Sequence, residues 1–137
     1  MPAKAIRRRF AAADAKSLYG NCDTRTLMAA NNLIYQLQKQ GKHTEAVSTL
    51  RKPLSDARRA LGDDHDITLS LGSLLGDSLA RVGTSPTVSN LHEAIAILED
   101  VCKRSRRLLG GSHPHTDTRQ RALDDARRFL AHHFPEG

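Results

Sequence analysis

The sequence predicts an all-α fold, an α-solenoid of about six helices arranged as antiparallel pairs, and three observations lead to it. The 137 residues include three Phe, two Tyr and no Trp, so the core must come from Leu, Ile, Val and Ala, which suits packed helices. Apolar residues recur at steps of three and four, whereas no convincing alternating run of the β-strand kind is present. Three stretches of the chain also resemble one another, which is typical of repeat proteins.

Three glycines mark the similar stretches, and they lie 42 and then 48 residues apart, at Gly20, Gly62 and Gly110. The third and the sixth residues after each glycine also align: Asp23, His65 and His113, and then Thr26, Thr68 and Thr116. Between the first two units the offset is 42 up to Gly83 and 48 beyond it, where the aligned pairs include Leu50 with Leu98 and Ala57 with Ser105. The additional residues form a polar insertion, which we expect to be a surface loop over 83–90.

Each unit resolves into two helices. In the first unit, one apolar stripe ends before Gly41 and the next ends at Gly62, where a glycine in the left-handed conformation can close a helix. The two stripes are Leu27, Ala30, Leu33, Ile34 and Leu37, and then Ala46, Leu50, Leu54, Ala57 and Leu61. Side-chain acceptors at the helix starts are predicted at Asp23 and Thr24, and at Asp63 and Asp64. Pro53 lies inside the second stripe, where it should kink the helix or mark a late start.

The expected helices span 3–19, 24–40, 43–61, 66–82, 90–109 and 115–133. We interpret the chain as one helical-repeat domain, 1–137, with a leading helix at 1–20, repeat one at 21–61 and repeat two at 62–109. A terminal capping helix at 110–133 and a tail at 134–137 follow. In the last helix, Asp117 and Arg127 stand where the second unit has Leu69 and Leu79, and such a polar face suits a terminal cap.

The net charge of +6 is concentrated at the two ends of the chain. Residues 1–20 hold five basic residues and one acidic residue, and residues 101–137 hold eight and four, so each segment carries +4. No stretch approaches the roughly 20 apolar residues that span a bilayer. Cys22 and Cys102 show no metal-ligand spacing, which fits a reducing compartment, and we expect a cytoplasmic protein. The first 13 residues, basic and alanine-rich, also resemble an organelle-targeting peptide.

The sequence does not predict catalysis, a metal or a cofactor. The closest histidine groupings, His113-Pro114-His115 and His132-His133, have no cysteine or acidic residue beside them at ligand spacing. The sequence contains no glycine-rich phosphate loop and no nucleophile elbow. We therefore expect a protein that is not an enzyme.

Several motifs resemble the tetratricopeptide repeats of the kinesin-light-chain type. They are the run Gly62-Asp-Asp-His-Asp-Ile-Thr-Leu69, the Asn31-Asn32-Leu33 of the first unit, and Gly41-Lys-His-Thr-Glu-Ala46. The run Gly110-Gly-Ser-His113-Pro114 repeats the first of these. The resemblance covers about residues 18–130 and implies a scaffold or adaptor that binds other proteins through the concave wall made by the first helix of each repeat.

Carried over position by position, the resemblance implies a partner-binding surface on three helices. It comprises Asn31, Asn32, Tyr35 and Gln38, then Ser73, Asp77 and Arg81, and then Arg121, Asp125 and Arg128. An asparagine amide can both donate to and accept from a peptide backbone, although Asn32 could equally satisfy neighbouring helix groups. The second unit has Ser73-Leu74 in place of the two asparagines, and only two full units are present. Docking into a larger complex through the basic ends is therefore an equal alternative.

A different class of partner is predicted by the basic clusters. Arginines and lysines at both ends could contact the phosphates of RNA, and they fall at Arg7, Arg8 and Arg9, and at Lys103, Arg104, Arg106 and Arg107. No aromatic residues are interleaved with them, and no base-reading motif accompanies them. A protein partner is thus the first hypothesis, and an RNA-binding or phosphate-binding accessory subunit is the alternative.

Overall fold

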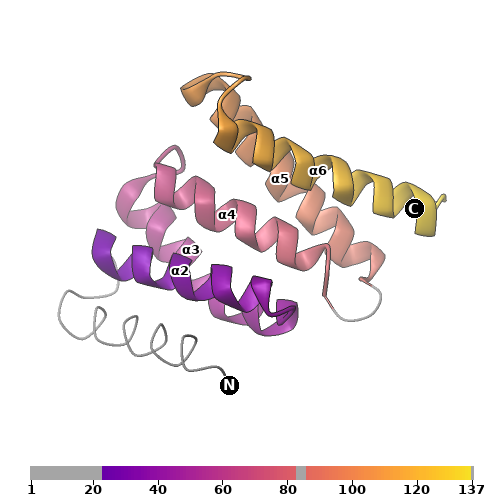
Figure 1. The fold of residues 1–137 in the computed structure, drawn as a ribbon, viewed down its shortest axis with the longest axis horizontal. Coiled ribbons are helices and arrows are strands. Elements are labelled where there is room, and N and C mark those ends of the chain that lie inside the picture. The colour runs from indigo at the N-terminus through magenta and orange to yellow at the C-terminus, as the bar shows by residue number, and fades with distance from the viewer. Residues whose placement is uncertain (1–22, 83–85, 137) are drawn as a thin grey trace. The chain divides into compact units, whose positions relative to one another are not determined.

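The computed structural model describes residues 23–82 and 86–136, and every regular element in them is an α-helix, five in number (Figure 1). The predicted all-α class is confirmed. The chain forms two compact units, residues 1–71 and 72–137, and the division falls inside one helix. The predicted leading helix and the cluster Arg7 to Arg9 lie outside the described residues.

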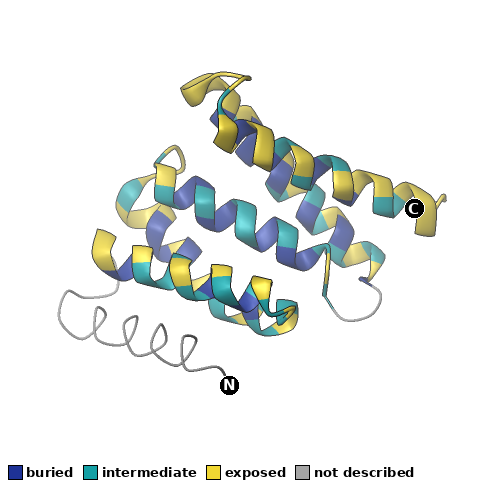
Figure 2. Cartoon of the chain, in the orientation of Figure 1, coloured by how far each residue is buried: buried dark blue, intermediate teal, exposed yellow. Residues whose placement is uncertain are grey.

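The first unit is built on a helix pair, α2 (Thr24–Lys39) and α3 (His43–Leu61), which pack against each other. The buried side chains of both helices follow the predicted stripes, as the dark bands of Figure 2 show. They include Leu27, Ile34 and Leu37 of α2, and Ala46, Leu50, Leu54 and Ala57 of α3. The helix α3 begins at His43 and continues through Pro53, so the late start that we considered for this helix is wrong.

The helix α4 (Asp66–Leu79) begins in the first unit and ends in the second, where α5 (Val88–Leu109) and α6 (Pro114–His133) follow. The helices α5 and α6 pack side by side (Figure 1). Around this pair lies a core of Leu98, Cys102, Leu123 and Ala126, to which Ala80 of α4 also packs. A Cβ atom placed on Gly76 would lie 2.6 Å from Cγ of Leu98, so α4 approaches α5 closely because this position lacks a side chain.

The helix starts differ from the prediction in one respect. Asp23 accepts a hydrogen bond from the backbone N–H of Arg25 at 2.8 Å, as an N-cap should. Before α4, Nδ1 of His65 accepts a hydrogen bond of 3.1 Å from the backbone N–H of Ile67, which is an acceptor that we did not expect. In the same way His113 caps α6 by accepting from His115. The third residue after each repeat glycine is therefore a helix cap.

Two predicted boundaries move by a few residues. The helix α4 ends at Leu79 and not at 82, because the N–H of Arg81 already bonds to the carbonyl of Ser78 in a tighter turn. The helix α5 begins at Val88 and not at 90, because the hydroxyl of Thr87 accepts from the N–H of Asn90 and caps the helix earlier. The last residues of the insertion at 83–90 therefore belong to α5.

Candidate interaction surfaces

The predicted positions on α2 divide between a structural contact and an exposed face. The amide oxygen of Asn31 accepts a hydrogen bond of 3.0 Å from the hydroxyl of Ser70 on α4, so Asn31 already joins two helices of the first unit. Asn32 is exposed, and Tyr35 is 46% exposed with the ammonium group of Lys39 4.9 Å from its ring centre. Gln38 is half-buried.

Met28 was missed by sequence reasoning and belongs to the same face. It is 52% exposed and lies one helical turn before Asn32, two turns before Tyr35. Met28 and Tyr35 thus add exposed apolar surface to the face that carries Asn32. Helical spacing could have indicated Met28, because it lies four positions before the predicted residue Asn32.

A pocket of about 350 Å³ lies between α4 and α6 in the second unit. Three of the predicted residues, Asp77, Arg81 and Asp125, line it. Nε of Arg81 lies 3.2 Å from a carboxylate oxygen of Asp77, and Nη2 of Arg128 lies 3.5 Å from Asp125. The rim of the pocket is therefore charged but internally paired, and it offers both donors and acceptors to a ligand. We call this the α4/α6 pocket.

The walls of the α4/α6 pocket are apolar, and sequence reasoning missed all of them: Ala80, Pro86, Ala122, Ala126 and Phe129. Phe129 stacks on His133 with ring centres 4.0 Å apart, which fixes the ring at one side of the pocket. Phe129 stands one turn after Asp125, so helical spacing could have indicated it. Pro86 could not be anticipated, because its place depends on how the chain returns from α4 to α5.

The remaining predicted positions do not line this pocket. Arg121 extends from α6 to an ion pair of 3.0 Å with Asp117, and Ser73 is half-buried on α4. Arg128 contributes only through its contact with Asp125. Of the three predicted positions on α6, only Asp125 lines the pocket, because helical spacing alone does not indicate which turns of α6 face α4.

A second, larger cleft of about 530 Å³ separates α5 and α6. Three of the predicted basic residues line this α5/α6 cleft, and so does Arg127, whereas Arg104 instead pairs with Asp100 at 2.9 Å. Its lining residues are Glu99, Cys102, Lys103, Arg106, Arg107, Gln120, Leu123 and Arg127. The basic cluster that the sequence showed as one run therefore divides between two faces of α5.

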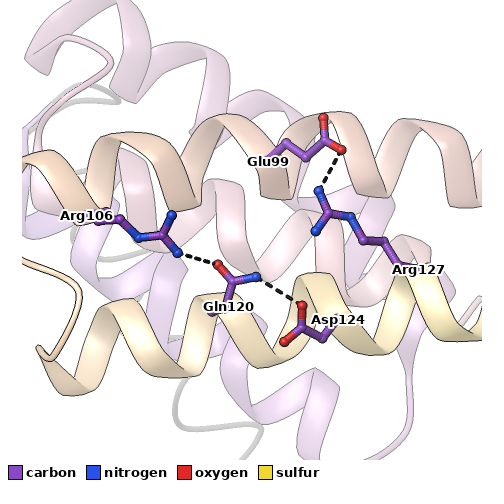
Figure 3. Close-up of polar contacts among 5 residues, drawn as sticks. All are labelled: Glu99, Arg106, Gln120, Asp124 and Arg127. Carbon is purple, nitrogen blue, oxygen red and sulfur yellow. Dashed lines mark hydrogen bonds and ion pairs between the residues drawn. The ribbon is translucent and has the colours of Figure 1, made fainter.

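The polar residues of the α5/α6 cleft are joined in two short chains of contacts (Figure 3). The guanidinium of Arg106 donates to the amide oxygen of Gln120 at 2.9 Å, and the amide nitrogen of Gln120 donates to Asp124 at 3.0 Å. Further along, Arg127 donates to Glu99 at 3.0 Å. The contacts of Arg106 and Arg127 connect α5 to α6 and restrain these two guanidinium groups.

A buried polar cluster between α5 and α6 was not predicted from the sequence. The hydroxyls of Ser105 and Thr116 are 2.9 Å apart, and Nη1 of Arg119 donates to Ser105 at 2.9 Å. Arg119 is only 5% exposed, which is unusual for arginine. Because α6 starts near Thr116, the cluster ties the beginning of α6 to the end of α5.

The described residues hold no group of three or more His, Cys, Asp or Glu side chains placed to bind a metal ion. Burial raises the pKa of the Cys102 thiol, so it disfavours the thiolate that a cysteine nucleophile needs. No helix in 23–82 and 86–136 is long and apolar enough to cross a membrane.

Comparison with known proteins finds a match to one family model over about half of the chain. Residues 26–66 and 89–115 match the model of a tetratricopeptide repeat family. The two matched stretches take in all of α3, most of α2 and nearly all of α5, with the start of α6. No curated protein matches the chain.

Proposed function

We propose that the chain, of which residues 26–66 and 89–115 match a tetratricopeptide repeat model, is an adaptor or assembly subunit that binds a partner protein through the α4/α6 pocket. Repeats of this family generally mediate contacts between proteins, and they are typically non-catalytic modules. The kinesin-light-chain-like type is part of the proposal. The observation that carries it is the combination of apolar walls and a charged, paired rim between two helices that occupy equivalent places in successive repeats.

The dimensions of the pocket indicate what it would accept. A volume of about 350 Å³ is near the lower end of ligand pockets, which run from roughly 300 to 1,000 Å³. Three of its wall residues are alanines, so an apolar side chain of the partner can approach the helix backbones closely. The rim pairs Asp77 with Arg81 and Asp125 with Arg128 would then meet the polar groups of the partner's backbone on either side.

The binding free energy that one buried apolar side chain supplies indicates whether the partner is a free peptide or a larger protein. Burial of one large apolar side chain contributes about 1.5–3 kcal/mol, whereas a dissociation constant of 1 μM requires about 8 kcal/mol. One pocket therefore supports only weak binding, so a stable partner must contact further surface. An assembly subunit held in a complex is therefore favoured over a protein that captures a short free peptide.

Affinity purification from the native source tests the proposal. The variants Arg81→Ala and Phe129→Ala alter the rim and the wall of the pocket, and Arg58→Ala removes an equally exposed arginine from α3 as the matched control. We expect the proteins that copurify with the wild type and with Arg58→Ala to be depleted about tenfold or more with the pocket variants. Partners that remain equally abundant with all three variants would contradict the proposed site.

A further inference from the structure

We infer that the α5/α6 cleft is a second docking site, which binds an acidic amphipathic helix of a partner protein. The cleft is distinct from the α4/α6 pocket, because its residues on α6 are Gln120, Leu123 and Arg127, whereas the pocket uses Ala122, Asp125, Ala126 and Phe129. The two sets alternate along α6 and lie on different faces of it.

The repeat alignment explains why a helix fits here. In the second repeat, Gly72 and Gly76 are the positions of α4 that lie against α5: added Cβ atoms would meet Val101 at 3.0 Å and Leu98 at 2.6 Å. At the offset of 48, the equivalent positions on α6 are Gln120 and Asp124. The face of α6 that borders the cleft is thus equivalent to the face of α4 that packs against α5. On this face, the first helix of a repeat contacts the second helix of the same repeat.

The cleft is positively charged. Four cationic side chains line it, together with the single carboxylate of Glu99, which bonds to Arg127. Arg106 is bonded to the neutral amide of Gln120, which leaves its charge to act on a ligand, and Lys103 is exposed beside it. An incoming helix with glutamates or aspartates along its flank would complement these charges.

The floor of the cleft is apolar and gives the helix a place for its other face. Cys102 and Leu123 lie there, each only 3% exposed, so they add little new apolar burial and the charged lining supplies most of the contact. From Glu99 to Arg107 the cleft runs along about 12 Å of α5, which matches about two turns of a docked helix. The occupant therefore needs apolar residues three or four apart in its centre and acidic residues beside them.

Two other occupants fit less well. A second copy of this chain docked by the same face would bring two positively charged clefts together, which is unfavourable. A phosphate backbone would meet the carboxylate of Glu99, and the lining has no aromatic side chain on which a base could stack. The geometry therefore favours an acidic protein segment over nucleic acid.

Fluorescence anisotropy with a designed peptide tests the inference on the full chain. The probe is a labelled 14-residue helical peptide with leucines at every third or fourth position and flanking glutamates. Its control has glutamine in place of every glutamate. We expect the glutamate peptide to bind at least about tenfold more tightly than the glutamine peptide at low salt, and this difference to shrink in about 0.5 M salt.

Charge reversal locates the binding. The double variant Lys103→Glu/Arg106→Glu should lose about tenfold in affinity for the acidic peptide and gain affinity for a lysine version of it, whereas Arg58→Glu on α3 should change neither. The recovery with the lysine peptide also shows that the double variant is folded. Arg81→Ala, in the α4/α6 pocket, should leave this binding unchanged. The proposals for the two sites are therefore tested independently.

Cys102 gives a second readout, since its side chain forms part of the floor. In a Cys22→Ser background, the bound peptide should slow the alkylation of Cys102. Equal affinity of the glutamate and glutamine peptides, no effect of the double variant, or displacement of the peptide by a single-stranded RNA at lower concentration than by unlabelled peptide would each overturn the inference.

Discussion

At the scale of the residue, two equivalent threonines show how one substitution alters a buried contact. Thr68 and Thr116 follow their repeat glycines at the same distance, and both are buried. The hydroxyl of Thr116 meets that of Ser105, whereas the hydroxyl of Thr68 has no hydrogen-bond partner among the described residues. The position equivalent to Ser105 is Ala57, which can neither donate nor accept through its side chain.

The two threonines should therefore respond in opposite ways to the same change. Thr116→Val removes a hydrogen bond and should lower the free energy of unfolding by about 1 kcal/mol. Thr68→Val replaces an unsatisfied buried hydroxyl with a methyl group of similar size and should leave the free energy of unfolding unchanged or raise it slightly. Urea unfolding followed by circular dichroism measures both. Equal losses in the two variants would contradict this explanation.

The contacts of individual side chains were the part of the candidate site that the sequence predicted least well. The alignment placed Asn31 on the binding face, yet its amide oxygen is occupied by Ser70, a residue 39 positions later in the chain. Arg119 likewise gave no sign in the sequence that it would be buried with Ser105. Such pairings depend on how helices distant in sequence come together, and local periodicity carries no information about them.

At the scale of the element, the close approach of α4 to α5 depends on glycine in the middle of a helix. Glycine is an unfavourable helix residue by roughly 0.5–1 kcal/mol relative to alanine, so its presence at position 76 requires a packing reason. The reason is Leu98, whose Cγ would lie 2.6 Å from a Cβ atom at that position.

Gly76→Ala should accordingly destabilise the protein by about 1–3 kcal/mol, despite the better helix propensity of alanine. Combining it with Leu98→Ala removes the atom that clashes, so the double variant should lose less stability than the sum of the two single variants. Thermal unfolding of the wild type, the two single variants and the double variant measures this double-mutant cycle. A stabilising Gly76→Ala, or strict additivity, would show that α4 does not pack on Leu98 in this way.

The positions of the helices were the part of the fold that the sequence predicted best, because helices are marked by local signals. The apolar stripes and the glycines with positive φ at 41, 62 and 110 are local signals, so the described helices could be assigned with ends near their observed ones. Caps were harder to predict, because histidine is a weaker capping signal than aspartate. At the start of α4, His65 accepts a hydrogen bond from Ile67, and we did not expect this residue to be a cap.

At the scale of the whole molecule, the two compact units carry different surfaces. The first presents Met28, Asn32 and Tyr35 on one face of α2, and the second contains the α4/α6 pocket and the α5/α6 cleft. The all-helical repeat architecture could be predicted from the repeat pattern alone. The location of the pocket could not be predicted, because its walls combine α4 and α6 with Pro86 of the connection between α4 and α5.

The most direct test of the central claim, that the α4/α6 pocket holds a partner protein, is site-specific photocrosslinking in an extract of the native source. A benzophenone amino acid replaces Phe129 in the pocket and, as the control, Ala60 on the exposed surface of α3. We expect a discrete crosslinked protein from position 129 that is absent from position 60 and is lost when Arg81→Ala is added. Crosslinks of equal pattern and strength from both positions would contradict it.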